Sequence, residues 1–255
     1  ATTEIYTLSP TRRSSDLVWD LQGNQLAVFE GHQSSVNSVS FNRDGKMLAS
    51  GSDDNTVRVW DLQGNQLAVF EGHQSSVNSV SFSPDGQRLA TASYDKTARV
   101  WDLQGNQLAV FEGHQSSVNS VSFSPDGQKL ATASYDKTVR IWDLNGKQLA
   151  LFKGHQNSVN SVSFSPDGKT LATASVDDTV KLWDLEENPL ALFQGHTDSV
   201  SSVSFSRDGK TLATASADKT VRLWDLQGNP LALLRGHQKG VSSIRFSRDG
   251  KTLAR

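Results

Sequence analysis

The 255-residue chain contains no cysteine, which excludes disulfide bonds, thiolate metal sites and cysteine nucleophiles. Its formal net charge is only −2, so there is no electrostatic argument for binding nucleic acid or an anionic membrane surface. No apolar run approaches the length of a membrane span, and no signal-like apolar segment occurs near the start. No stretch carries sustained helical periodicity. These absences lead us to expect a cytoplasmic, non-helical protein without a nucleic-acid or membrane partner.

What the chain does contain is one unit that returns every 41 residues. A Trp-Asp pair marks each copy, at Trp19, Trp60, Trp101, Trp142, Trp183 and Trp224. Gly-His pairs keep the same step and use all 6 histidines of the chain; they begin at Gly31, Gly72, Gly113, Gly154, Gly195 and Gly236. A fixed period of this length is typical of repeat architectures.

Each unit has the pattern of four short strands. In the copy that begins at Gly72, β-branched and aromatic runs with turn residues between them predict strands at about 77–82, 89–93, 97–101 and 108–111. The turn Ser83-Pro84-Asp85-Gly86 joins the first two, because Pro presets φ and Gly accepts a positive φ. The pattern therefore predicts one antiparallel β-meander per repeat.

The unit resembles the WD-repeat propeller family over residues 18–255. The residues that carry this resemblance are Gly-His at the start, Ser-x-Asp-x-Thr near the third strand and Trp-Asp at its end. The resemblance implies an all-β fold, a β-propeller of four-stranded antiparallel blades around a central channel. Five complete repeats are expected at 31–71, 72–112, 113–153, 154–194 and 195–235. A sixth is split between residues 236–255 and 18–30, and either closes a six-blade ring or leaves an open arc.

Residues 1–17 share nothing with the repeat. They resemble a translated sequencing adapter, so a non-native leader is expected, with a genuine disordered tail as the alternative. The segment DLQGNQLAVFEGHQSSVNSVSF also occurs unchanged from Asp20, Asp61 and Asp102, which points to recent duplication. We therefore expect the array to be a fragment of a longer protein. The resemblance to WD-repeat propellers implies a signalling or effector domain outside this fragment, such as an ATPase, protease or kinase.

Serine, histidine and aspartate recur together in the repeats, and these are the ingredients of nucleophilic catalysis. Five such sets, each with a Trp attached, argue against a single active site. The resemblance instead implies a structural tetrad in which Asp accepts from His, His from a Ser of the second strand, and Ser from the indole N–H of Trp. The expected tetrads are His32, Ser52, Asp54 and Trp60; His73, Ser93, Asp95 and Trp101; His114, Ser134, Asp136 and Trp142; His155, Ser175, Asp177 and Trp183; and His196, Ser216, Asp218 and Trp224.

Two further motifs suggest ligands. Asp-Gly-Lys-Thr at Asp167, Asp208 and Asp249 imitates the end of a phosphate-binding loop, but the preceding Gly is missing and a strand follows instead of a helix. The acidic bends at 52–55 and 176–178 offer two or three oxygens, whereas calcium takes six to eight. Both motifs are interpreted as turns, and no catalytic residue, metal or cofactor is expected.

The positions at which the repeats differ predict a binding surface. One set precedes the Asp of the bend and another follows the His by two residues, and in a meander both lie at the same end of the sheet. That end resembles the face by which WD-repeat propellers bind partners, although drift at exposed loops is an alternative explanation. The candidate rim comprises Ser34, Asp53, Ser75, Tyr94, Ser116, Tyr135, Asn157, Val176, Asp198, Ala217 and Lys239.

The sequence therefore predicts a non-enzymatic scaffold that presents a rigid loop rim to a protein or peptide. The alternative is an enzyme or small-molecule-binding propeller that uses the central channel. That alternative requires an asymmetric cluster of carboxylates or His on the innermost strands, which carry Ser, Asn and Val instead. A nucleic-acid reader would require a basic stripe with exposed aromatics, whereas only scattered Lys lie near the rim.

Overall fold

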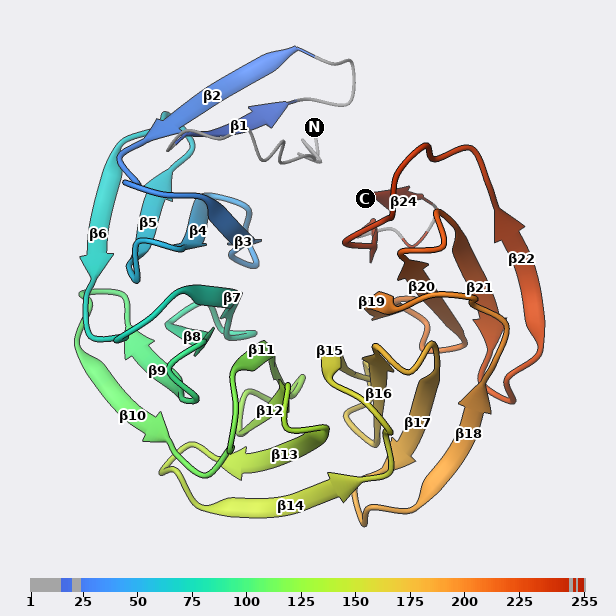
Figure 1. Cartoon of the computed structure of the whole chain (residues 1–255). Helices are drawn as coiled ribbons and strands as arrows, with labels where there is room; N and C mark the ends of the chain where they lie inside the picture. The colour runs from blue at the N-terminus through green and yellow to red at the C-terminus, as the bar shows by residue number, and fades with distance from the viewer. Residues whose placement is uncertain (1–14, 20–23, 248–249, 251, 255) are drawn as a thin grey trace.

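The computed structural model describes residues 15–19, 24–247, 250 and 252–254. Every regular element within these residues is a strand. The described part of the chain therefore has no helix that could cross a bilayer. Five sheets of four antiparallel strands follow one another along the chain, and the strands of each sheet pair in chain order. Figure 1 shows these sheets arranged radially, with the first strand of each innermost and the fourth outermost. The predicted all-β blades are confirmed.

The strands keep nearly the same bounds in every blade. They are β3 (Val36–Phe41), β4 (Met47–Ser52), β5 (Val57–Asp61) and β6 (Gln66–Phe70); β7 (Val77–Phe82), β8 (Arg88–Ser93), β9 (Ala98–Asp102) and β10 (Gln107–Phe111); β11 (Val118–Phe123), β12 (Lys129–Ser134), β13 (Thr138–Asp143) and β14 (Gln148–Lys153); β15 (Val159–Phe164), β16 (Thr170–Ser175), β17 (Val180–Asp184) and β18 (Pro189–Phe193); and β19 (Val200–Phe205), β20 (Thr211–Ser216), β21 (Val221–Asp225) and β22 (Pro230–Leu234).

The split repeat forms two separate two-stranded sheets. β1 (Ser15–Trp19) pairs with β2 (Gln25–Glu30), and β23 (Arg245–Phe246) pairs with β24 (Leu253–Ala254). Among the described residues no pairing joins these two sheets, and they lie on either side of an opening in the arc (Figure 1).

The leader expected at residues 1–17 overlaps the first strand at its last three residues. Ser15, Asp16 and Leu17 belong to β1 and lie opposite Glu30, Phe29 and Val28 of β2. A strand ladder is made by backbone groups, so a segment whose side chains lack the repeat pattern can still take the place of a third strand. Residues 1–14, which include Arg13 at the position of the tetrad Asp, lie outside the described residues.

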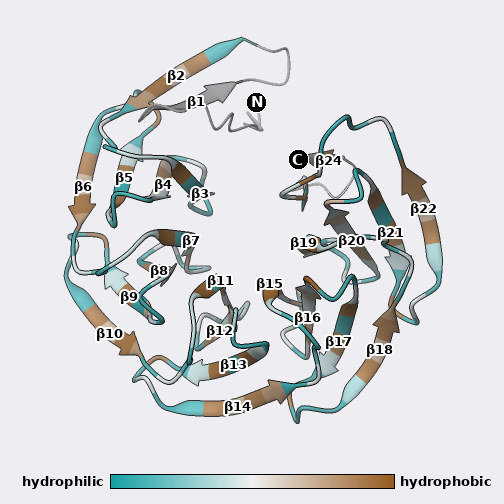
Figure 2. Cartoon of the chain, in the orientation of Figure 1, coloured by the Kyte–Doolittle hydropathy of each residue, from teal (hydrophilic) through white to brown (hydrophobic). Residues whose placement is uncertain are grey.

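The hydrophobic core lies between blades. One cluster joins Ala90 and Phe111 of one blade to Val121 and Trp142 of the next. The Phe111 and Trp142 rings meet edge to face with centroids 5.8 Å apart. The pairs Phe29–Trp60, Phe152–Trp183 and Phe193–Trp224 repeat this geometry, and Phe70 and Trp101 meet at a tilted angle. Figure 2 shows that β10 changes from hydrophilic at its beginning to hydrophobic along the rest, which follows from Gln107 followed by Leu, Ala, Val and Phe. Small Ala side chains on the second strand leave room for the neighbouring Trp, so the blades pack closely.

Polar side chains of the innermost strands join each blade to the next. The side-chain amide of Asn78 donates to the carbonyl of Val118 at 2.9 Å, and the hydroxyl of Ser38 accepts from the amide of Val80 at 3.1 Å. The innermost strand is the edge of its sheet, where alternate backbone groups lack a strand partner. The Asn and Ser of these strands satisfy those groups, which explains why the channel wall repeats these two residue types.

Phe111 provides a test of packing between blades. It is fully buried against Trp142, so Phe111→Ala should lower the free energy of unfolding by about 3–5 kcal/mol because a cavity opens between two blades. Leu108 lies on the same strand and is 53% exposed, so Leu108→Ala should change the free energy of unfolding by only about 0.5 kcal/mol. Urea unfolding measures both; equal losses would contradict a core that lies between blades.

Candidate interaction rim

A chain of hydrogen bonds runs through each complete blade. It ends beneath the loops at one end of the blade, and these loops together form one face of the arc. In the blade of β11 to β14, the indole Nε1 of Trp142 donates to Oγ1 of Thr132 at 2.9 Å. Nε2 of His114 lies 2.8 Å from the same oxygen, and Nδ1 of His114 lies 2.8 Å from Oδ2 of Asp136. A neutral imidazole fits this order: Thr132 accepts from the indole and donates to Nε2, and Nδ1 donates to the carboxylate.

The hydroxyl that links Trp to His in these hydrogen bonds is not the predicted one. The expected serines were Ser52, Ser93, Ser134, Ser175 and Ser216. The structure instead uses the residue two positions earlier, which is Ser50, Thr91, Thr132, Thr173 or Thr214.

Strand register explains this correction. Trp142 lies opposite Leu130, so Thr132 is its diagonal neighbour, within reach of a large side chain. Ser134 lies four residues from that register, roughly 13 Å along the strand. Its hydroxyl accepts from the amide of Asp136 at 3.0 Å and donates to the carbonyl of Ser117 at 2.8 Å, so it holds the bend in place. Counting the register of the hairpin between the second and third strands would have identified the threonine.

The glycine of the Gly-His pair also has a structural cause. Gly113 has a φ of 145°, in a region that side chains disfavour. A Cβ there would lie 2.5 Å from Nη1 of Arg140 and 3.4 Å from Cη2 of Trp142. The chain therefore passes directly over the Trp side chain just before it places His114 in the hydrogen-bond chain.

Burial and hydrogen bonding set the charges of these groups. Burial lowers the pKa of His32, His73 and His196, and this effect outweighs the nearby carboxylates, which raise it. Burial raises the pKa of Asp54, but hydrogen bonds from Thr56, the backbone of Gln33 and His32 outweigh it and lower that pKa to about 2. The other four tetrad aspartates have lowered pKa values for the same balance of reasons, namely Asp95, Asp136, Asp177 and Asp218. For His32, His73 and His196, a neutral imidazole next to a carboxylate is therefore the stable arrangement.

The buried hydroxyls exclude a catalytic use of these sets. Thr91, Thr132, Thr173 and Thr214 are all 0% exposed, so no substrate can reach the oxygen that His contacts. Each oxygen already has a Trp and a His as partners. The sets act as satisfied structural networks, which are stable only when every member is paired.

The two predicted groups of rim residues lie at the same end of the blades. The amide of Tyr94 donates to the carbonyl of Ser76 at 2.9 Å, which joins the bend to the loop that enters the first strand. The amide of Gln74 in that loop donates to Oδ2 of Asp95 at 3.0 Å. The bonds from Asp53, Tyr135, Val176 and Ala217 to the preceding loop repeat this arrangement. The rim is therefore tied to the buried hydrogen-bond chain beneath it.

Two tyrosines of the rim come together. Tyr94 and Tyr135 belong to neighbouring blades, their ring centroids lie 6.4 Å apart, and the residues are 54% and 47% exposed. The remaining rim residues differ in exposure. Asp53, Asn157, Asp198 and Lys239 are exposed, whereas Ser34, Ser75, Ser116, Val176 and Ala217 are half-buried.

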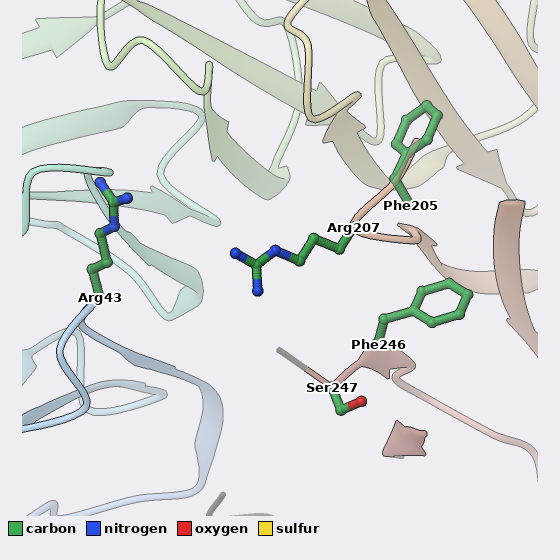
Figure 3. Close-up of a pocket in the computed structure, with 5 residues that line it drawn as sticks. All are labelled: Arg43, Phe205, Arg207, Phe246 and Ser247. Atoms are coloured by element: carbon green, nitrogen blue, oxygen red, sulfur yellow. The ribbon is translucent and has the colours of Figure 1, made fainter. Parts of the chain in front are cut away.

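A cavity of ≈ 290 Å³ opens into the channel near the opposite end of the blades. It is lined by Arg43, Phe205, Arg207, Phe246 and Ser247. Figure 3 shows Arg207 extending across the opening toward the side from which Arg43 projects. The lining is basic and aromatic, so it lacks the carboxylate or His cluster that the alternative of a channel enzyme would require.

A double-mutant cycle tests which hydroxyl belongs to the hydrogen-bond chain. Thr132→Val should cost about 1–3 kcal/mol in unfolding free energy, because buried groups on Trp142 and His114 lose their partner. Combining it with Trp142→Phe should cost clearly less than the sum of the two changes. Ser134→Ala combined with Trp142→Phe should be additive to about 0.5 kcal/mol. Coupling of Trp142 to Ser134 instead of Thr132 would contradict the structure.

The shifted pKa values predict loss of stability in acid. A His whose pKa is lowered by folding stays neutral while the unfolded chain takes up protons below about pH 6.5, so acidification favours unfolding from there. An Asp with a lowered pKa stabilises the fold above about pH 4 and loses this contribution as the pH falls toward its folded value. Urea midpoints should therefore be level above about pH 7.5, decline below about 6.5 and fall more steeply below about 4. A midpoint that rises between pH 7 and pH 5 would mean that the histidines are charged in the fold.

Comparison with known proteins agrees with this geometry. No curated protein matches the chain. A family model for WD40, described as WD domain, G-beta repeat, matches residues 23–61, 64–102, 105–143, 146–184, 187–225 and 228–254. Each full match takes in the last strand of one blade and the first three strands of the next, so the family unit spans a blade junction. The chain belongs to the WD40-repeat family.

Proposed function

We propose that this chain is a non-enzymatic interaction scaffold whose rim binds a protein or peptide partner. The observation that carries the proposal is the exposed pair Tyr94 and Tyr135 on neighbouring blades. Large aromatic side chains that remain exposed together on a surface of otherwise smaller or charged residues mark a contact site. Binding of proteins or peptides is also what WD40 domains generally do.

The way in which the tyrosines are held supports this role. Each follows a fully buried serine, Ser93 or Ser134, and precedes an Asp that is fixed by His and Thr. A side chain on such a fixed bend has little conformational entropy to lose when a partner binds. Tyr combines this rigidity with a large amphipathic surface, which is why it is enriched at interface hot spots.

A second candidate function is the binding of a small molecule in the channel. The cavity of ≈ 290 Å³ between Arg43 and Arg207 supports it, since two guanidinium groups and two Phe rings could hold a small anion with an apolar part. The rim is favoured because its two tyrosines contact each other on loops that are hydrogen-bonded to the blades. The cytoplasmic location expected from the sequence stays a prediction.

Capture experiments with matched variants test the proposal. Tyr94→Ala and Tyr135→Ala should each weaken partner binding by about 2 kcal/mol, because each removes a rigid aromatic contact. Their unfolding midpoints should remain close to that of the unchanged chain, since both side chains are exposed. Quantitative mass spectrometry of proteins retained from source-cell lysate measures the loss.

The control variants lie at the opposite end of the same blades. Gln87→Ala and Gln128→Ala replace exposed residues in the turns between the first two strands, and should leave capture unchanged. Loss of capture in the Gln variants with full capture in the Tyr variants would contradict the proposal. Retention of no protein, together with protection of β19 and β23 by a small molecule, would favour the channel.

A further inference from the structure

The residue after each tetrad Asp has an unusual backbone conformation. Its φ is 70° at Asn55, 71° at Lys96, 70° at Lys137, 66° at Asp178 and 69° at Lys219. Asn and Asp are the side chains that tolerate this left-handed region best, and other residues adopt it at a cost in free energy. Lys96 and Lys137 are therefore not the residues that the backbone alone would favour.

These two lysines lie next to the tyrosine pair. Lys96 follows Tyr94 by two residues on the same bend, Lys137 follows Tyr135 in the same way, and both lysines are exposed. The side chains of the carboxylates between them, Asp95 and Asp136, are engaged by His and Thr and are only 7% and 8% exposed, so the lysines carry the exposed charge of these bends. Tyr94, Lys96, Tyr135 and Lys137 thus form one surface, here called the aromatic–cationic patch.

Negative charge lies on the rim to either side of this patch. On one side Asp53 is exposed, and its carboxylate accepts from the amide of Asn37 at 2.7 Å. On the other side are Asp178 and the exposed Asp198. Burial raises the pKa of Asp178, and the nearby charges of Asp198, Asp177 and Asp218 raise it further, which indicates a concentrated negative potential there. Positive charge beside the tyrosines is therefore confined to two blades.

We infer that the aromatic–cationic patch binds a short linear peptide segment in which acidic side chains flank an apolar or aromatic one. The apolar or aromatic side chain of the peptide packs on the rings of Tyr94 and Tyr135. The peptide carboxylates on either side of it pair with the ammonium groups of Lys96 and Lys137. This inference rests on the proposed function and specifies the chemistry of its partner.

Single-stranded nucleic acid is the other polymer that combines planar groups with negative charge. Its charge continues at every residue, so a strand longer than the patch would pass over Asp53 or the acidic residues at Asp178 and Asp198. A peptide can place its acidic residues only where the lysines lie. The charge pattern of the rim therefore favours a peptide.

Selection from a library of short random peptides displayed on phage tests the inference. Peptides retained by the unchanged chain should contain more Asp and Glu than the starting library, together with an apolar or aromatic residue. The double variant Lys96→Glu with Lys137→Glu should bind representative synthetic peptides at least about tenfold more weakly, because two attractive charges become repulsive. The matched control is Lys219→Glu, which reverses a lysine with the same backbone conformation on another blade and should leave binding unchanged.

The outcomes separate this inference from the proposed function. Selected peptides that bind equally well to the Tyr94→Ala, Tyr135→Ala double variant, or no selected peptide at all, would contradict both. Peptides that depend on the tyrosines but lack acidic residues, or bind undiminished to the Lys96→Glu, Lys137→Glu variant, would overturn only the inference. A labelled single-stranded oligonucleotide that displaces the peptides and needs the same four side chains would also overturn it, in favour of nucleic acid.

Discussion

The rim depends on the buried hydrogen bonds that lead from Trp through a hydroxyl and His to Asp. In one blade Trp142 lies on the third strand, Thr132 on the second, His114 in the entering loop and Asp136 in the bend. One continuous network therefore fixes both loops of the rim to the sheet. A buried indole or imidazole without a partner would be costly, so the four residue types are required together.

Because the blades repeat one geometry, their residues fall into two groups. One group makes the contacts that join neighbouring blades, and the other lies on the surface and varies from blade to blade. Phe111 on Trp142 and Asn78 on Val118 join blades by contacts that recur at most blade junctions. Side chains outside these contacts are freer to differ, and many of them lie on the rim and in the turns at the opposite end. At the rim this variation produces a tyrosine pair with lysines beside it, whereas near the opposite end it places arginines around a cavity.

Most of the fold can be predicted from the sequence, because the spacing of the repeated residues determines where each strand and turn lies. The period, the turn at Ser83 to Gly86 and the pairing of His with Asp across the loop and bend require only local patterns. The hydroxyl partner was misassigned because Thr132 and Ser134 share a face of their strand, and only the register of Trp142 opposite Leu130 separates them. The strand at Ser15 to Leu17 lies two periods before the strand predicted at 97–101, but its residues do not follow the repeat pattern, so only the spacing predicts it. The contact of Tyr94 with Tyr135 depends on the angle between blades, which no spacing encodes.

A crystal structure of the chain with a bound peptide would test the central claim most directly. The account predicts peptide density against the rings of Tyr94 and Tyr135, with the hydrogen bonds from Trp101 and Trp142 through to Asp95 and Asp136 unchanged beneath it. Density for the peptide in the cavity between Arg43 and Arg207, or against the turns that contain Gln87 and Gln128, would contradict it.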